Sequence, residues 1–243
     1  MSHIDTSANL NPWRQKPLAE KGLLALGMLV IAVGVPSWQS ALAVAAIMTG
    51  ATLAAAHVDV GTWWKTITAP FGFLLIGVVT IALQVKGWHV GLAPNGVQLA
   101  GRLAARAFAG LTCLLFLTLT TPATDLVVGM RRLGVPVEIT DVALLMYRFL
   151  FLLTDTAADM NLAQAARLGH VSYRRHMQSL GLLIANLMPR ALSRAQALEV
   201  GLAARGWHGD LVVLRPARRV SPFNMGVIAV LELAVLLFGL HYV

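Results

Sequence analysis

Five long apolar runs, separated by short polar segments, constrain the fold of this chain more than any other feature. They cover residues 22–35, 41–56, 69–85, 103–121 and 223–241. A helix needs about 20 mostly apolar residues to cross the hydrocarbon of a bilayer. Charged residues make up only 12% of the chain, whereas soluble domains carry about 25%. The sequence therefore predicts an all-α membrane protein with about five transmembrane helices, in which residues 1–243 form a single domain.

The distribution of positive charge predicts which parts of the chain face the cytoplasm. Residues 122–222 hold 12 of the 19 Lys and Arg residues and seven of the 11 acids. Because cytoplasmic loops carry an excess of Lys and Arg, we expect the N-terminus and this segment on the cytoplasmic side of the cell membrane, and the C-terminus outside. Five crossings satisfy that arrangement. Lys86 and Arg102 lie in a predicted outer loop, which leaves a different number of crossings open.

The cytoplasmic segment contains helical patterns that are too short or too polar to span. Val142–Leu153 is apolar over 12 residues and merges into Thr154–Arg167, which has a helix-forming composition. A second apolar run, Ser179–Met188, ends at Pro189, and Arg190–Arg205 places apolar residues at helical spacing. These patterns predict amphipathic helices that pack on the inner face of the membrane.

One short pattern occurs twice in this segment. It reads Ala165-Ala166-Arg167-Leu168-Gly169-His170 in the first copy and Ala203-Ala204-Arg205-Gly206-Trp207-His208 in the second. Either copy alone fits an ordinary helix end, with arginine in the last turn and Gly169 or Gly206 in the left-handed capping position. Two matching copies, each with small alanines before the arginine, favour a pair of docking points for a partner surface.

These residues resemble the transmembrane (T) component of energy-coupling factor ABC transporters, and most closely its cobalt-transport branch, the CbiQ family. In that family cytoplasmic coupling helices end in Ala-Arg-Gly-type motifs. Ala204-Arg205-Gly206 matches the motif, and Ala166-Arg167-Leu168 departs from it by a leucine in place of glycine. Further similarity lies in Thr121–Leu126, in Leu133-Gly134-Val135-Pro136 and in Arg148-Phe149 within an apolar helix.

The resemblance implies a scaffold that transmits force in an importer and is not itself an enzyme. Its expected partners are two ABC-type ATPase subunits, a substrate-binding membrane subunit and the lipid bilayer, with no cofactor. The residues expected to dock onto the ATPase subunits are Ala166, Arg167, Leu168, Ala204, Arg205 and Gly206. Cobalt is the favoured cargo, and the same role in a nickel or vitamin importer stays open.

Other motifs narrow the choice of function. The chain has no Gly-x4-Gly-Lys-Ser/Thr phosphate loop, so we expect no ATPase activity of its own. Its seven histidines are dispersed, so no metal site is expected, and its basic residues show no pattern for nucleic acid. A membrane-embedded lipid-modifying enzyme is the alternative from a different class. It would need clustered acids, and Asp155 and Asp159 are the only close pair on one helical face.

Charged residues within apolar helices form a last group of candidates. Glu232 lies near the middle of the last span and Arg148 within an apolar helix, so both are candidates for intramembrane polar contacts. A carboxyl group buried and hydrogen-bonded inside the bundle is the alternative interpretation of Glu232. Arg102 and Arg106 lie one helical turn apart, and we expect them to anchor the outer end of the fourth span rather than bind an anion.

Overall fold

The structure is a computed structural model that describes residues 11–86, 89–92, 94–206 and 221–241. The chain divides into two compact units, the first formed by residues 1–126 with 216–243 and the second by residues 127–215.

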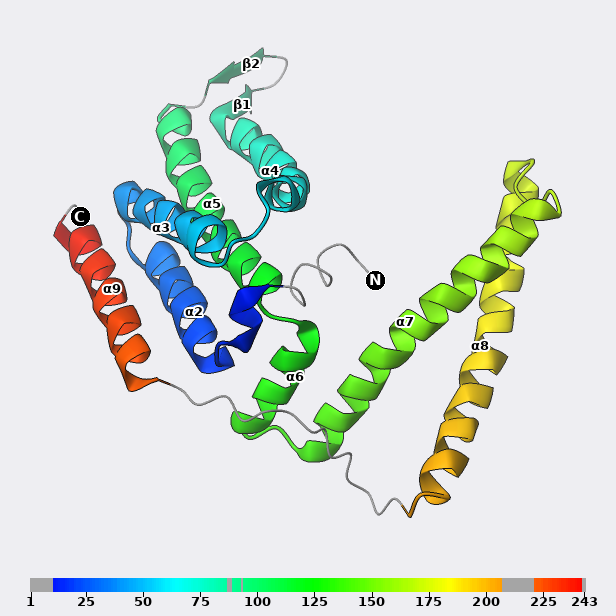
Figure 1. Ribbon diagram of the computed structural model, residues 1–243. Coiled ribbons are helices and arrows are strands. Elements are labelled where there is room, and N and C mark those ends of the chain that lie inside the picture. Colours follow the sequence, from blue (N-terminus) through cyan, green and yellow to red (C-terminus); the bar gives the residue numbers. More distant parts are fainter. Residues whose placement is uncertain (1–10, 87–88, 93, 207–220, 242–243) are drawn as a thin grey trace. The chain divides into compact units, whose positions relative to one another are not determined.

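The first unit is a bundle of helices connected by short turns (Figure 1). Its elements are η1 (Pro12–Gln15), α2 (Leu18–Gly34), α3 (Trp38–Gly50), the π-helical turn η2 (Ala51–Ala55), α4 (Val60–Ala82), β1 (Leu83–Lys86), β2 (His89–Leu92), α5 (Gly96–Thr120) and α9 (Pro222–His241). Four segments are long and apolar enough to cross a membrane, namely Trp38–Ala55, Val60–Ala82, Gly96–Thr120 and Pro222–His241. The all-α membrane fold is thus confirmed, and the two short strands only form a hairpin between α4 and α5.

The third apolar run shows the largest shift of boundaries. Residues 69–85 were expected to span, but α4 begins at Val60 because the Asp59 side chain accepts a hydrogen bond from the Thr62 amide at 3.0 Å and caps the helix. Pro70 lies inside α4 without ending it. The helix stops at Ala82, because the next residues pair in an antiparallel hairpin that joins Leu83 to Leu92.

Helix α2 contains only 17 residues, at the lower limit for a membrane crossing. At its start, Lys21 Nζ donates to the Thr120 carbonyl at 2.9 Å, at the end of α5. Just beyond its last turn, the Val35 carbonyl accepts from an Arg106 Nη atom of α5 at 3.0 Å. A Cβ built on Gly239, near the end of α9, would lie 2.9 Å from Val35 Cγ1. Helix α2 therefore extends alongside both α5 and α9, from one end of the bundle to the other.

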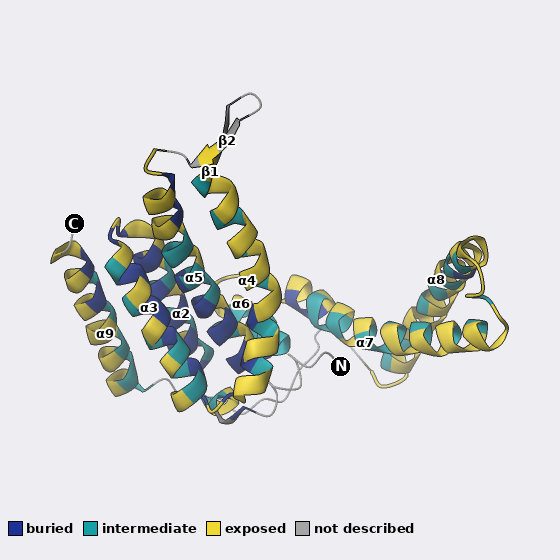
Figure 2. Cartoon of the chain, turned by 90° about the horizontal axis from the view of Figure 1, so that it is seen from above, coloured by how far each residue is buried: buried dark blue, intermediate teal, exposed yellow. Residues whose placement is uncertain are grey.

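The core of this unit lies where α2, α3 and α5 meet. Met28, Ala32, Val44, Met48 and Phe116 are fully buried there, whereas the outward faces of α4 and α9 are exposed (Figure 2). Those exposed faces consist largely of apolar side chains. Such faces suit a surface whose solvent is lipid.

The second unit consists of three helices, of which α6 begins before the unit boundary. They are α6 (Ala123–Arg132), α7 (Val137–Ala166) and α8 (Tyr173–Ala203). The predicted merging of two helical stretches into one α7 is confirmed. The apolar run that ends at Pro189 and the helical stretch 190–205 are not separate helices, because α8 continues through this proline to Ala203. A proline costs about 3 kcal/mol in a helix, but the residues that follow are strong helix formers such as Ala, Leu, Arg and Gln.

Candidate functional site

The first arginine motif forms the end of α7. Arg167 follows the last helical residue, and Leu168 adopts the left-handed conformation with φ 59°. The Leu168 amide donates to the Ala165 carbonyl at 3.0 Å, and the Gly169 amide donates to the Gln164 carbonyl at 2.9 Å. This pair of hydrogen bonds is a Schellman motif. The predicted left-handed role of Gly169 is therefore wrong, because Leu168 takes that position.

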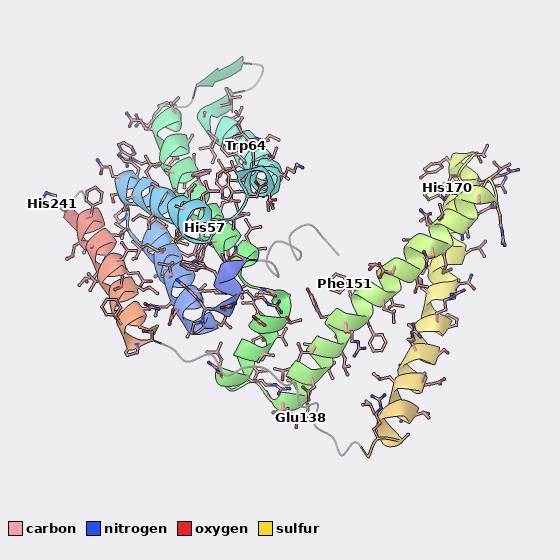
Figure 3. All side chains as sticks on the ribbon, viewed as in Figure 1. His57, Trp64, Glu138, Phe151, His170 and His241 are labelled. Carbon is pink, nitrogen blue, oxygen red and sulfur yellow. The ribbon has the colours of Figure 1, made fainter. Side chains whose placement is uncertain are left out.

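Gly169 is needed for a different reason, namely the close approach of α8. A Cβ at this position would lie 2.6 Å from Ser179 Oγ and 2.9 Å from the Gln164 carbonyl oxygen. Ser179 donates to the Gly169 carbonyl at 3.2 Å, and the rings of His170 and His176 meet edge to face at 4.8 Å. Figure 3 shows His170 at this turn, where α7 gives way to α8. The turn is thus tied to α8 by both the backbone and side chains.

The second arginine motif forms the end of α8. The Arg205 amide donates to the Leu202 carbonyl and the Gly206 amide to the Ala203 carbonyl, both at 3.0 Å. Gly206 has a φ of 69°, so the predicted left-handed glycine is confirmed here. Trp207 and His208, which complete this copy of the motif, lie outside the described residues.

The two motifs share one geometry. In each, the arginine directly precedes the left-handed residue, which is Leu168 in the first copy and Gly206 in the second. Both arginines are exposed, and within the described part of the chain neither side chain has a hydrogen-bond or ion-pair partner. The 31 residues of α8 separate them, which corresponds to roughly 46 Å along the helix axis. The structure therefore places two exposed cations at opposite ends of one helix.

The end of α6 provides an internal comparison, because it is also capped and basic. Gly134 has a φ of 91°, and the Val135 amide donates to the Met130 carbonyl at 3.2 Å. Here the neighbouring arginine is engaged: Arg131 forms an ion pair with the buried Asp141, and its Nε donates to Thr140 Oγ1 at 2.6 Å. Arg131 therefore has partners at its helix end, whereas the side chains of Arg167 and Arg205 have none among the described residues.

Glu232 and Arg148, the two candidates for intramembrane polar contacts, lie in different units of the structure. Glu232 lies on α9 against Gly27 of α2, where any larger side chain would meet its carboxylate. Its Oε1 atom is buried and has no hydrogen-bond partner among the described residues. Arg148 is exposed on α7, which is not among the four segments that meet the length and hydropathy criteria for a span. A functional contact for either residue stays a prediction.

Sequence reasoning missed two buried charges at the start of α2. Glu20 is 4% exposed and Lys21 is 1% exposed. The Glu20 carboxylate accepts from the Ser221 amide at 3.0 Å and from Asn224 Nδ2 at 3.2 Å, at the start of α9. An acid and a base directly before an apolar run were the signal in the sequence. Charges at the start of such a helix can become buried with it, and buried charges require partners.

These helices and helix ends define a multi-pass, all-α membrane protein that exposes a cation at each end of a long helix. The chain belongs to the CbiQ family of cobalt transport proteins, whose family model matches residues 11–214. It is similar to the cobalt transport protein CbiQ of Rhodobacter capsulatus, with 44% identity over 239 residues that cover 98% of each chain.

More distant relatives carry related names. The cobalt transport protein CbiQ of Salmonella typhimurium is 32% identical over 105 residues, which cover 43% of this chain and 47% of the relative. A putative fused cobalt transport protein CbiMQ of Methanocorpusculum labreanum is 29% identical over 143 residues, or 59% of this chain and 24% of the relative. The family places this chain among transport proteins.

Proposed function

We propose that this chain is the membrane subunit that couples ATP hydrolysis by partner ATPase subunits to the import of cobalt ions. The observation that carries the proposal is the placement of Arg167 and Arg205. Each is exposed, without a partner in the described residues, and directly precedes a left-handed residue, at opposite ends of α8. Two similar docking points at this separation suit two copies of one partner fold better than a single ligand.

Helix α8 acts in this proposal as a lever between the two docking points. Each arginine enters a groove on one ATPase subunit, where its planar guanidinium forms several charge-assisted hydrogen bonds. When the ATPase subunits close on ATP, the two ends of the helix follow their grooves. The bond between Ser179 and Gly169 transmits the movement to α7, because it holds the two helices together at their turn.

A substrate-binding membrane subunit is the third partner in the proposal. The relative named as a fused cobalt transport protein CbiMQ supports it, since the matched part accounts for only 24% of that longer chain. Apolar side chains along α7 and α8 supply a surface for such a subunit, and Met146, Leu150, Leu182 and Met188 are among those exposed. Movement of α7 and α8 then changes the side of the membrane that the substrate-binding subunit faces.

The proposed orientation places the N-terminus and residues 122–222 in the cytoplasm, and the C-terminus outside. The hydrogen bonds of Glu20 and Lys21 support it, because they bring the start of α2, the end of α5 and the start of α9 to the same end of the bundle. Cysteine labelling at Gln178 and Val243, in a Cys113→Ala background, tests it. The two positions should react from opposite sides of the membrane, and labelling from one side would contradict five crossings.

The experiment that tests the coupling role compares Arg167→Ala, Arg205→Ala and the double variant. Each single change removes charge-assisted hydrogen bonds worth roughly 1.5–3 kcal/mol apiece, so cobalt uptake per folded molecule should fall at least tenfold. The double variant should also lose the ATPase subunits on purification. Arg→Lys at either position should restore only part of the uptake, since an ammonium group lacks the planar set of donors.

Arg194→Ala is the matched control, because Arg194 is exposed near the middle of the same helix. It should leave uptake and copurification unchanged. If both single alanine variants transport like wild type at equal protein level, the arginines serve only as helix ends and the coupling proposal fails.

A further inference from the structure

A cavity of about 680 Å³ opens between α3, α4 and α5, away from the arginine motifs. Its size falls within the roughly 300–1,000 Å³ of typical ligand sites. Apolar and aromatic side chains form most of its wall, and the polar side chains that line it among the described residues are Gln98 and Arg102. The lining residues with the largest side chains are Trp38, Leu42, Phe71, Arg102 and Phe108.

Two aromatic side chains of the cavity contact each other, but much of the aromatic surface is exposed. Phe71 of α4 and Phe108 of α5 meet edge to face at 6.1 Å, which holds the two helices at a fixed separation. Even so, Trp38 is 47% exposed and Phe71 is 44% exposed. Uncovered apolar surface of this kind on membrane-spanning helices suits contact with acyl chains.

Arg102 and Arg106 lie one turn apart on α5 but differ in their contacts. Arg106 reaches across to the Val35 carbonyl, one of the carbonyl groups that helix α2 leaves unpaired at its end. It therefore joins α5 to the end of α2. Arg102 is exposed, lines the cavity and has no hydrogen-bond or ion-pair partner among the described residues. Anchoring of the span therefore leaves Arg102 without an assigned role.

We propose that this cavity binds one anionic glycerophospholipid, with its phosphate on Arg102 and an acyl chain along the aromatic wall. An arginine binds phosphate through two parallel hydrogen bonds, and the Gln98 amide supplies a further donor at the same rim. Leu42, Phe71 and Phe108 provide the apolar surface that an acyl chain needs. A free phosphate ion would leave this apolar surface uncovered, whereas a phospholipid accounts for both the cation and the apolar wall.

The position of the cavity along the helices agrees with a lipid headgroup. Arg102 is six residues after the start of α5 at Gly96, or roughly 9 Å along the helix axis. Trp38 is the first residue of α3, and tryptophan is enriched where membrane meets water. The cavity therefore has its cation near the expected depth of lipid phosphates. This assignment also explains why a positive charge is kept at the end of the bundle that the charge distribution predicts to be outside.

Native mass spectrometry of the purified full-length chain tests the proposal. Phosphatidylglycerol and phosphatidylcholine are titrated separately, and the apparent dissociation constant of the first bound lipid is measured. We expect wild type to bind phosphatidylglycerol about tenfold more tightly than phosphatidylcholine. Arg102→Ala should abolish this difference, since loss of a charge-assisted pair corresponds to about a tenfold change or more. Arg102→Gln should do the same without leaving a hole.

Two further variants separate the headgroup from the acyl chain. Phe71→Ala should weaken both lipids by a similar factor, because it removes only apolar surface. Lys65→Ala is the matched control, as Lys65 is exposed on the same helix as Phe71 but does not line the cavity. It should leave both constants unchanged.

Three results would overturn the proposal. The first is equal affinity for the two lipids in wild type, or an unchanged preference in Arg102→Ala. The second is displacement of phosphatidylglycerol by millimolar inorganic phosphate, which would make the site one for a free anion. The third is loss of the bound lipid on assembly with the partner subunits, which would mean that a partner helix fills the cavity.

Discussion

Replacement of Glu20 tests the packing of α9 against the bundle. In the wild-type chain the Glu20 carboxylate is 4% exposed and accepts two hydrogen bonds, from the Ser221 amide and from Asn224 Nδ2. Both donors belong to the first turn of α9 or directly precede it, where the positive end of the helix dipole favours a carboxylate. Glu20→Ala leaves both donors without this partner.

The magnitude follows from the number and kind of these bonds. A hydrogen bond to a charged group contributes about 1.5–3 kcal/mol. Asn224 is only partly buried, so we take the low end and expect Glu20→Ala to lower the free energy of unfolding by about 3 kcal/mol. For a chain of this size that corresponds to a fall in Tm of about 6–12 °C. Glu20→Gln retains an acceptor oxygen but no charge, and we expect about half of this effect.

Thermal unfolding of the detergent-purified chain, followed by circular dichroism, measures the effect. A double-mutant cycle with Asn224→Ala isolates one bond, and the coupling energy should fall between about 0.5 and 3 kcal/mol. Val230→Ala is a suitable control, since this residue lies on the exposed face of the same helix and should change the Tm by little. A Tm for Glu20→Ala within 2 °C of wild type, or a coupling energy near zero, would refute the reasoning.

Two further predictions concern the second unit. Gly169→Ala should destabilise the turn between α7 and α8 by about 1–3 kcal/mol, because the added Cβ meets a backbone oxygen, whereas Leu168→Gly should be nearly neutral. Hydrogen exchange of peptides from this turn measures both, and equal protection in the two variants would contradict the assigned geometry. Arg131→Ala should cost about 2 kcal/mol, since it removes the ion pair that Arg131 forms with the buried Asp141. Arg132→Ala is its control, and chemical denaturation that fails to separate the two would count against a structural role for Arg131.

The two arginine motifs show which features local sequence can predict. Their repetition predicted two helix ends with a cation at each, and helices α7 and α8 end within a residue or two of the expected positions. The sequence did not reveal which residue adopts the left-handed conformation in the first copy. Glycine adopts it most easily, yet Leu168 holds it while Gly169 makes room for Ser179. That choice depends on how close α8 passes, which is a tertiary contact.

Pro189 shows a second limit of rules that consider only local sequence. The sequence pattern divided residues 179–205 into two stretches at Pro189, and a proline inside a helix removes one backbone hydrogen bond. The helix continues because its remaining residues compensate for that loss along 31 residues. A rule for proline alone gives the free-energy cost of that residue, but it leaves out the contributions of the other residues of the helix.

By itself, the sequence determined the fold class and the two arginine motifs, since each depends on composition and periodicity within a short stretch. Only the tertiary structure decided which charges are engaged. Arg106 contacts the end of α2, while the Arg102 side chain has no partner among the described residues. Glu20 and Lys21 join the ends of three helices, although about 100 to 200 residues separate them from their partners. Hydrophobic periodicity places a residue on a face of its own helix. The partner of a buried charge is set by which helix ends meet in space, and that depends on the packing of the whole bundle.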